Sequence, residues 1–233
     1  MGSVFRFKQF EIDQGDCAMK INTDGVLLGA LAEGPDARRV LDIGTGTGVI
    51  AMMIAQRYPE ASIDAVEIDE HASMQAYKNF RRSVFSERLH VIGGAFEETV
   101  PTEPYDLIVS NPPFYTNSLH NPDPRRKMAK HADNGFFERL LSFVDRNLSG
   151  NGKFQCIVPV TVADMLADIL PEGLFLQEEL SICSFPGEEP IRRLLSFGRA
   201  ANVLRSDLFV IYAGKGVYTQ RYKDILQPYF LAF

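Results

Sequence analysis

The sequence lacks the features of several protein classes. Its 233 residues include three cysteines and four histidines. The cysteines are widely separated and form no Cys-x-x-Cys pair, which argues against a disulfide scaffold and a zinc module and indicates a reducing compartment. The histidines have no metal-ligand spacing. We therefore expect no metal.

Long apolar segments are also absent. No run approaches the ~20 apolar residues that span a bilayer. Residues 1–8 contain no uninterrupted apolar stretch of the kind found in a secretory signal. We expect a cytoplasmic protein without a membrane partner. The formal net charge of -6 weakens any overall attraction to nucleic acid, although local basic clusters matter more than the sum.

The composition is that of a globular protein, with 45% hydrophobic and 23% charged residues. From residue 40 onward, segments with strand and helix patterns alternate. The predicted strands are 40–43, 63–68, 89–92, 105–110 and 153–158. The predicted helices are 47–57, 70–82, 134–148 and 161–169. This alternation predicts an α/β fold with a mostly parallel sheet covered on both faces.

Both ends of the chain have distinct patterns. Two further predicted strands, 177–185 and 206–212, have no long helix between them, so we expect a seven-stranded sheet whose last strand is antiparallel. Residues 5–12 predict a short strand or hairpin. Residues 219–233 predict a capped helix and an aromatic end that docks on the body.

A glycine-rich turn follows the first strand of the alternating region. Residues 42–48 read Asp-Ile-Gly-Thr-Gly-Thr-Gly and open a helix. Gly44, Gly46 and Gly48 allow the backbone to approach a ligand at the carboxyl edge of the sheet. The structural alternative is a tight turn that merely requires glycine.

Two cofactor classes fit this turn. The dinucleotide pattern fails at Val49 when counted from Gly44, although residues 46–51 fit its looser variant. S-adenosylmethionine carries an ammonium and a sulfonium and no pyrophosphate. Asp42, directly before the glycines, suits such a cation and would repel a pyrophosphate. The turn therefore favours S-adenosylmethionine.

The ends of the next two strands complete this predicted site. Glu67 lies about 20 residues past the turn, where an acid accepts both ribose hydroxyls. Asp69 is its rival, unless it caps the helix that begins at Glu70. At residues 93–96 (Gly-Gly-Ala-Phe) no acid is present to contact the adenine, which leaves backbone amides and the Phe96 ring. The candidate cofactor residues are Asp42, Gly44, Gly46, Gly48, Glu67, Ile68, Ala95, Phe96 and Asn111.

The turn after the fourth strand reads Asn111-Pro112-Pro113-Phe114. An amino group on a base or an amide is a poor nucleophile because its lone pair is delocalised. The Asn111 carboxamide oxygen and the Pro112 carbonyl can accept its two N–H bonds and direct the lone pair at a methyl donor, while the prolines fix the backbone. Phe114 would stack on the planar group. We assign catalysis to these four residues; an ordinary Asn-Pro turn is the alternative.

Together these motifs resemble the class I, S-adenosylmethionine-dependent methyltransferases of amino groups. Nearly the whole chain resembles the bacterial valine-tRNA (adenine-N6) methyltransferases, which modify the nucleotide 3′ of the anticodon. The similar segments are 5–10, 17–20, 23–29, 42–48, 66–69, 111–114, 118–119, 122–123, 218–222 and 229–231. The absence of an acid at Gly94 is the main departure from the pattern.

The resemblance implies a Rossmann-like class I methyltransferase fold, S-adenosylmethionine as cofactor and tRNA as substrate. It places Lys20 and Thr23 near the methionine part of the cofactor. We divide the chain into an N-terminal extension, 1–35, that packs on the cofactor site, and a methyltransferase domain, 36–233. We expect a monomer or a weak homodimer.

A basic segment follows the Asn-Pro-Pro-Phe turn. The side chains expected to hold RNA, together with Phe114, are Arg125, Arg126, Lys127, Lys130 and His131. They could hold phosphates while a base is flipped into the site; a solvated segment without a partner is the alternative.

Three other functions remain open from the residues. The same turn serves enzymes that methylate guanine N2 of ribosomal RNA or glutamine N5 of a protein. The short region before the first strand disfavours the glutamine reaction. An NAD-linked oxidoreductase lacks a convincing Tyr-Lys pair here. A non-catalytic RNA-binding module would not need an intact Asn111.

Overall fold

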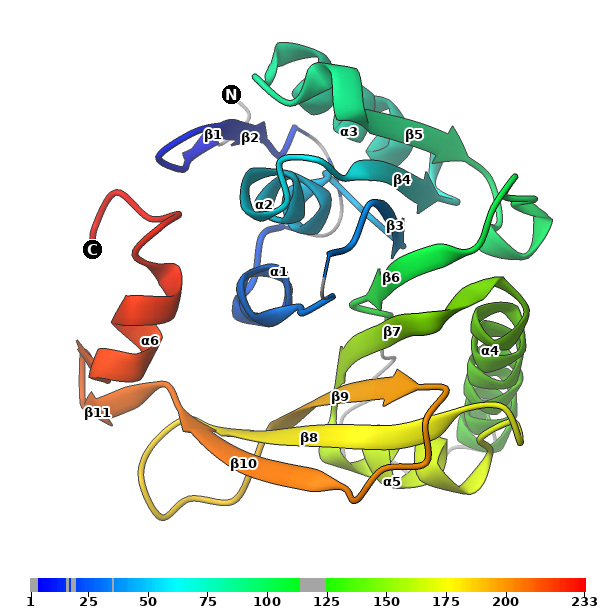
Figure 1. Cartoon of the computed structure of the whole chain (residues 1–233). Coiled ribbons are helices and arrows are strands. Elements are labelled where there is room, and N and C mark those ends of the chain that lie inside the picture. The colour runs from blue at the N-terminus through cyan, green and yellow to red at the C-terminus, as the bar shows by residue number, and fades with distance from the viewer. Residues whose placement is uncertain (1–3, 16, 18–19, 35, 114–124) are drawn as a thin grey trace.

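A computed structural model describes residues 4–15, 17, 20–34, 36–113 and 125–233, with only the backbone described for 125–134. Among these residues eight strands form one sheet, in the order β10-β8-β9-β7-β6-β3-β4-β5 (Figure 1). The strands are β3 (Arg39–Ile43), β4 (Ser62–Glu67), β5 (Leu89–Gly93), β6 (Tyr105–Ser110), β7 (Leu148–Val158), β8 (Phe175–Cys183), β9 (Arg192–Gly198) and β10 (Arg205–Val210).

The mostly parallel α/β sheet is confirmed, but its strand count and its antiparallel member differ from the expectation. The antiparallel strand is β9, which lies between β7 and β8. β10, expected to be antiparallel, is parallel to β8. The reason is that β9 reverses the chain after β8 and the loop at 199–204 reverses it again. Two reversals return β10 to the direction of β8. The sheet has eight strands instead of seven because β9 was not predicted.

Six helices are described: α1 (Thr23–Leu31), α2 (Val49–Arg57), α3 (Glu70–Arg82), α4 (Arg125–Asn147), α5 (Val160–Asp168) and α6 (Gln220–Leu226). α1, α2, α3 and α6 pack on one face of the sheet, around a core that includes Leu27, Met53 and Phe80. α4 and α5 cover the other face, where Leu140 and Phe143 are buried. Both faces are therefore covered, as parallel sheets require.

α1 was not predicted from the sequence. Asn22 caps it by accepting a hydrogen bond from the Gly25 backbone N–H at 2.8 Å. Residues 25–30 are all buried. A Cβ at Gly29 would lie 2.9 Å from Met53 Sδ, so glycine allows α1 to approach α2 closely. At the N-terminal end of α1, a Cβ at Gly25 would lie 3.6 Å from the Asn111 carboxamide nitrogen, so this end of the helix lies at the carboxyl edge of the sheet.

The two ends of the described chain meet, as predicted for the tail. The hairpin of β1 (Val4–Arg6) and β2 (Glu11–Asp13) lies beside residues 227–233, and a bridge joins Phe7 to Phe230. The Lys8 ammonium donates hydrogen bonds to the main-chain oxygens of Gln227 (2.5 Å) and Phe233 (2.9 Å). A second hairpin, β11 (Tyr212–Gly214) with β12 (Val217–Tyr218), leads into α6.

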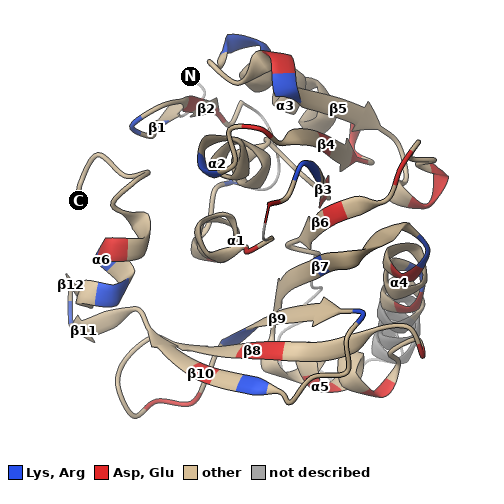
Figure 2. Cartoon of the chain, viewed as in Figure 1, with Lys and Arg blue, Asp and Glu red and all other residues tan. Residues whose placement is uncertain are grey.

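The surface of the described chain carries both charges. Figure 2 shows Lys and Arg interspersed with Asp and Glu over most of the elements. Within the same described part, no helix combines the length and apolarity needed to cross a bilayer.

Candidate active site

The glycine turn lies at the carboxyl end of β3 and borders a cavity of about 300 Å³. Gly44, Gly46 and Gly48 have φ angles of 72°, 57° and 91°, which favour glycine. A Cβ at Gly44 or Gly46 would meet nothing within 4 Å, whereas a Cβ at Gly48 would lie 2.3 Å from the Phe80 ring. Gly44 and Gly46 border the cavity, and Gly48 instead allows α2 to begin against α3.

Asp42 lies beneath this turn and is absent from the described cavity wall. Its side chain is fully buried, and its Oδ2 accepts hydrogen bonds from Thr45 Oγ1 (2.7 Å) and the Ala51 backbone N–H (3.2 Å). Burial raises the pKa of the Asp42 carboxyl to about 7. Asp42 therefore stabilises the turn through these two hydrogen bonds, and its contact with a cationic cofactor stays a prediction.

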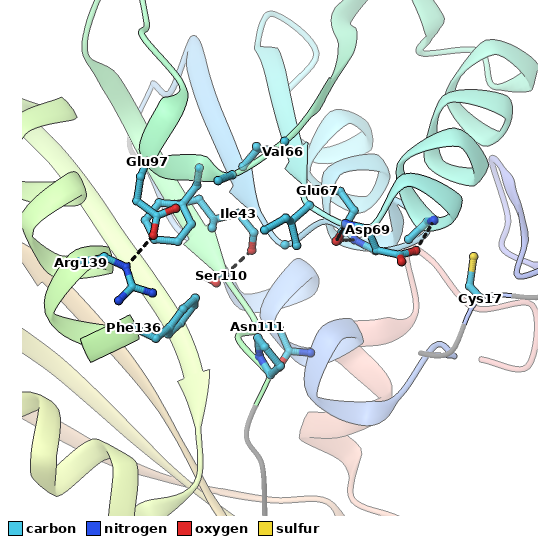
Figure 3. Close-up of a pocket in the computed structure, with 18 residues that line it drawn as sticks. Cys17, Ile43, Val66, Glu67, Asp69, Glu97, Ser110, Asn111, Phe136 and Arg139 are labelled. Carbon is cyan, nitrogen blue, oxygen red and sulfur yellow. Dashed lines mark hydrogen bonds and ion pairs between the residues drawn. The ribbon is translucent and has the colours of Figure 1, made fainter. Parts of the chain in front are cut away.

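Glu67, at the end of β4, borders the cavity beside the turn (Figure 3). Its two carboxylate oxygens accept hydrogen bonds from the backbone N–H groups of Gly46 (2.8 Å) and Asp69 (2.9 Å). The Asp69 side chain accepts from the Ala72 N–H at 2.8 Å and caps α3. Asp69 also borders the cavity, but its carboxylate lies against the start of α3, whereas that of Glu67 lies against the glycine turn, which favours Glu67 as the acceptor for a ligand.

The wall beyond Glu67 is largely apolar. Ile68 is 75% exposed, and Ala95 and Phe96 border the same cavity. The Phe96 ring is edge-packed against Phe136 and Phe143, with centroids 5.8 and 5.5 Å away. Flat apolar walls of this kind suit a purine ring.

Asn111 and Pro113 close the cavity at the end of β6. Ser110 Oγ donates to the Ile43 carbonyl at 3.0 Å, which ties this end of β6 to the end of β3. The Asn111 carboxamide nitrogen faces α1, since a Cβ at Gly25 would lie 3.6 Å from it. The carboxamide oxygen is on the other side of the same planar group and is the acceptor that the predicted chemistry requires.

A second cavity, of about 560 Å³, shares Asn111 and Pro113 with the first and also includes Pro112. Thr23 borders this second cavity and not the first. Lys20 borders neither: its ammonium donates to the carbonyls of Gly15 (2.8 Å) and Gln14 (3.4 Å). The structure thus does not bring Lys20 to the described wall of either cavity.

Several predicted substrate-binding residues lie outside the described part of the chain. This holds for Phe114 and for the side chains of Arg125, Arg126, Lys127, Lys130 and His131, whose backbone begins α4. Their roles stay predictions. Among the described residues, no cluster of three His, Cys, Asp or Glu side chains could hold a metal ion.

Eight residues of the described cavity wall were not named in the sequence analysis: Cys17, Ile43, Val66, Ala72, Glu97, Ser110, Phe136 and Arg139. Arg139 Nε donates to Glu97 Oε1 at 2.8 Å and joins α4 to the turn after β5. Cys17 lies in a segment that resembles the methyltransferase family, which was a usable signal. Phe136 and Arg139 reach the site from a helix far along the chain, and no local motif marks them.

Comparisons with known proteins agree with this geometry. A methyltransferase small domain model matches residues 18–139. A tRNA1(Val) (adenine(37)-N6)-methyltransferase of Pedobacter heparinus is 49% identical and covers 100% of both chains. One of Aeromonas hydrophila subsp. hydrophila is 42% identical and covers 98% of each.

A solved structure shares the fold. It is a predicted O-methyltransferase of Agrobacterium tumefaciens, with a TM-score of 0.69 and 19% identity over 88% of this chain and 96% of that one. The full-length identities and the domain match decide the family. The chain belongs to the methyltransferase small domain proteins and, among them, to the family of tRNA1(Val) (adenine(37)-N6)-methyltransferases.

Proposed function

We propose that this chain transfers a methyl group from S-adenosylmethionine to N6 of adenine 37 in tRNA1(Val). The observation that carries the proposal is the position of Asn111, which borders both cavities at the carboxyl edge of the sheet. The names of the relatives at 49% and 42% identity support adenine over guanine or glutamine as the acceptor.

The residues of the first cavity fit the cofactor. Glu67 presents a carboxylate beside the open turn at Gly44 and Gly46, as a ribose diol requires. Ile68, Ala95 and Phe96 supply apolar surface for the adenine ring. When bound, S-adenosylmethionine supplies an electrophilic methyl carbon on a sulfonium.

Asn111 and Pro112 act on the acceptor amine. The Asn111 carboxamide oxygen and the Pro112 carbonyl accept the two N–H bonds of adenine N6, which directs the nitrogen lone pair at the methyl carbon. With the cofactor bound, N6 would bond to that carbon while the carbon–sulfur electron pair returned to sulfur as a neutral thioether, and the proton of the cationic amine would pass to water. The displacement depends on alignment, which rigid prolines and a strand-end asparagine provide.

Residues that follow Pro113 in the chain contact the RNA in this proposal. Phe114 stacks on the adenine, and the basic segment from Arg125 to His131 holds RNA phosphates. Residues 1–35 pack on the cofactor site as an extension of a domain formed by 36–233. A tRNA substrate supports a cytoplasmic location, and we propose a monomer or weak homodimer as the acting form.

The proposal is tested by transfer to a defined RNA. The purified chain is incubated with labelled S-adenosylmethionine and a tRNA1(Val) transcript, and the nucleosides are identified by mass spectrometry. We expect N6-methyladenosine from this transcript and none from a transcript with guanine at position 37. Label in the guanine transcript, or in neither, would contradict the proposal.

A further inference from the structure

The second cavity lies on the far side of Asn111 from the cofactor cavity. Its wall comes from the ends of β6, β8 and β10 and from the first residues of β9, all at one edge of the sheet. β9 begins there because it is antiparallel. Ligands of open α/β sheets bind outside this edge. A group held in the second cavity would therefore reach Asn111 from the side opposite the cofactor.

The walls of this cavity combine apolar and hydrogen-bonding surface. Ile182, Ile211 and Pro112 are apolar, whereas Asn22, Thr23 and Ser184 carry donors and acceptors. A heteroaromatic base has the same combination of flat faces and polar edges.

Tyr212 forms a fixed part of the wall. Its ring is stacked with Phe185 (5.4 Å between centroids) and with Tyr218 (5.0 Å). Reorienting the Tyr212 ring would break both aromatic contacts. The cavity shape at this side is thus set before any ligand binds.

Arg192 places a cation in the same wall. Its Nε donates to Asp24 Oδ2 at 2.8 Å, and its Nη1 donates to the Ile191 carbonyl at 2.8 Å. Asp24 belongs to the first turn of α1, so the guanidinium plane is held between α1 and β9. A guanidinium positioned in this way suits a phosphate oxygen.

Arg193 provides an internal comparison. It follows Arg192 on β9, and consecutive strand residues point to opposite faces. Its guanidinium pairs with Asp164 of α5 (2.6 Å) and Glu179 (3.4 Å), and it borders neither the first nor the second cavity. Both arginines lie on β9 and pair with carboxylates, but only Arg192 borders the second cavity.

We infer that the second cavity is the binding site of the target nucleoside, flipped out of its RNA strand, and that Arg192 contacts a phosphate next to that nucleoside. The inference rests on the proposed function, because the cavity adjoins the proposed catalytic residue Asn111. It adds Ser184, Arg192 and Tyr212 to the residues proposed to contact the substrate.

Arg192→Gln and its matched control Arg193→Gln test the phosphate contact. The anticodon stem-loop of tRNA1(Val) is titrated with each protein at several salt concentrations. We expect Arg192→Gln to weaken binding and to reduce the slope of log K against log salt by about 0.7 to 0.9, one phosphate contact. Arg193→Gln should keep the wild-type slope, and the affinity for S-adenosylmethionine should be unchanged in both variants. Equal slopes in the two variants would overturn the Arg192 contact.

Ser184→Phe tests the cavity itself, with Ser206→Phe on the exposed part of β10 as control. The stem-loop carries 2-aminopurine at position 37, whose fluorescence rises when the base leaves the stack. We expect the fluorescence to rise when the stem-loop binds the wild type or the Ser206→Phe control. In Ser184→Phe this rise should be lost. A full rise in Ser184→Phe would overturn the inference.

These readouts separate the two proposals. Binding slopes and base fluorescence test the cavity without any methyl transfer. A wild type that flips the base but transfers no methyl group would retain this inference and contradict the proposed function. Methyl transfer by the wild type, together with a full fluorescence rise in Ser184→Phe, would support the proposed function and contradict this inference.

Discussion

The Glu67 carboxylate accepts a hydrogen bond of 2.8 Å from the backbone N–H of Gly46. The acid at the end of β4 thereby holds the glycine turn at the end of β3. The same carboxylate borders the cofactor cavity. One side chain thus both fixes the loop and presents an acceptor to the ligand.

Glu67→Gln should weaken binding of S-adenosylmethionine about 10- to 100-fold, since a hydrogen bond to a charged group contributes about 1.5 to 3 kcal/mol. Isothermal titration calorimetry measures the change. Asp69→Ala is the control: it should reduce the free energy of unfolding by about 1 kcal/mol through loss of the helix cap, with a smaller effect on affinity. A larger affinity loss in Asp69→Ala would reverse the two assignments.

Asn111→Ala should retain binding of S-adenosylmethionine and lower methyl transfer by about two orders of magnitude or more, as loss of a preorganised acceptor does. Single-turnover transfer to the tRNA1(Val) transcript gives the rate, and titration of the cofactor gives the affinity. Wild-type transfer by Asn111→Ala would remove Asn111 from the mechanism.

Asp42 should make stability depend on pH. Its pKa of about 7 in the folded chain exceeds its ordinary value of 3.8, so the folded state binds the proton more tightly than the unfolded state. This contribution is fully present below pH 3.8, falls between pH 3.8 and 7 by at most about 1.4 kcal/mol per pH unit, and is lost above pH 7. Asp42→Asn cannot titrate, so its free energy of unfolding relative to wild type should rise across that range in urea denaturation. A difference that stays constant with pH would contradict this.

Gly46→Ala and Gly48→Ala should differ although both residues have positive φ. Gly46→Ala meets no neighbouring atom and should cost about 1 to 2 kcal/mol of stability from backbone conformation alone. It also places a methyl group beside the cavity and should weaken cofactor binding. Gly48→Ala adds the clash with Phe80 and should cost about 2 to 5 kcal/mol. Thermal and urea unfolding compare the two, and equal losses would show that Phe80 moves aside.

The sequence predicted those elements whose ends carry strong local signals. α3 occupies 70–82 and β6 occupies 105–110, as predicted, because Asp69 caps the helix and Asn-Pro stops the strand. Glu67 and Asn111 were found for the same reason, since the carboxyl ends of parallel strands meet at one edge.

α1 and β9 were missed for a physical reason. Residues 25–30 of α1 are buried on all sides, so no polar face marks a helical period. The last five residues of β9 are likewise buried on both faces and lack the alternation of a half-exposed strand. Without β9 the sequence could not predict the direction of β10 or the second cavity, whose wall includes Arg192.

The meeting of the β1–β2 hairpin with residues 227–233 has a practical consequence for protein engineering. The Lys8 contacts and the Phe7–Phe230 bridge hold the two ends together without help from either cavity. A circular permutant could connect them by a flexible linker and open new ends in the exposed loop at 201–203. Such a rearranged chain would leave the carboxyl edge of the sheet intact. Fusion partners could then be attached at the new ends, away from the original ones.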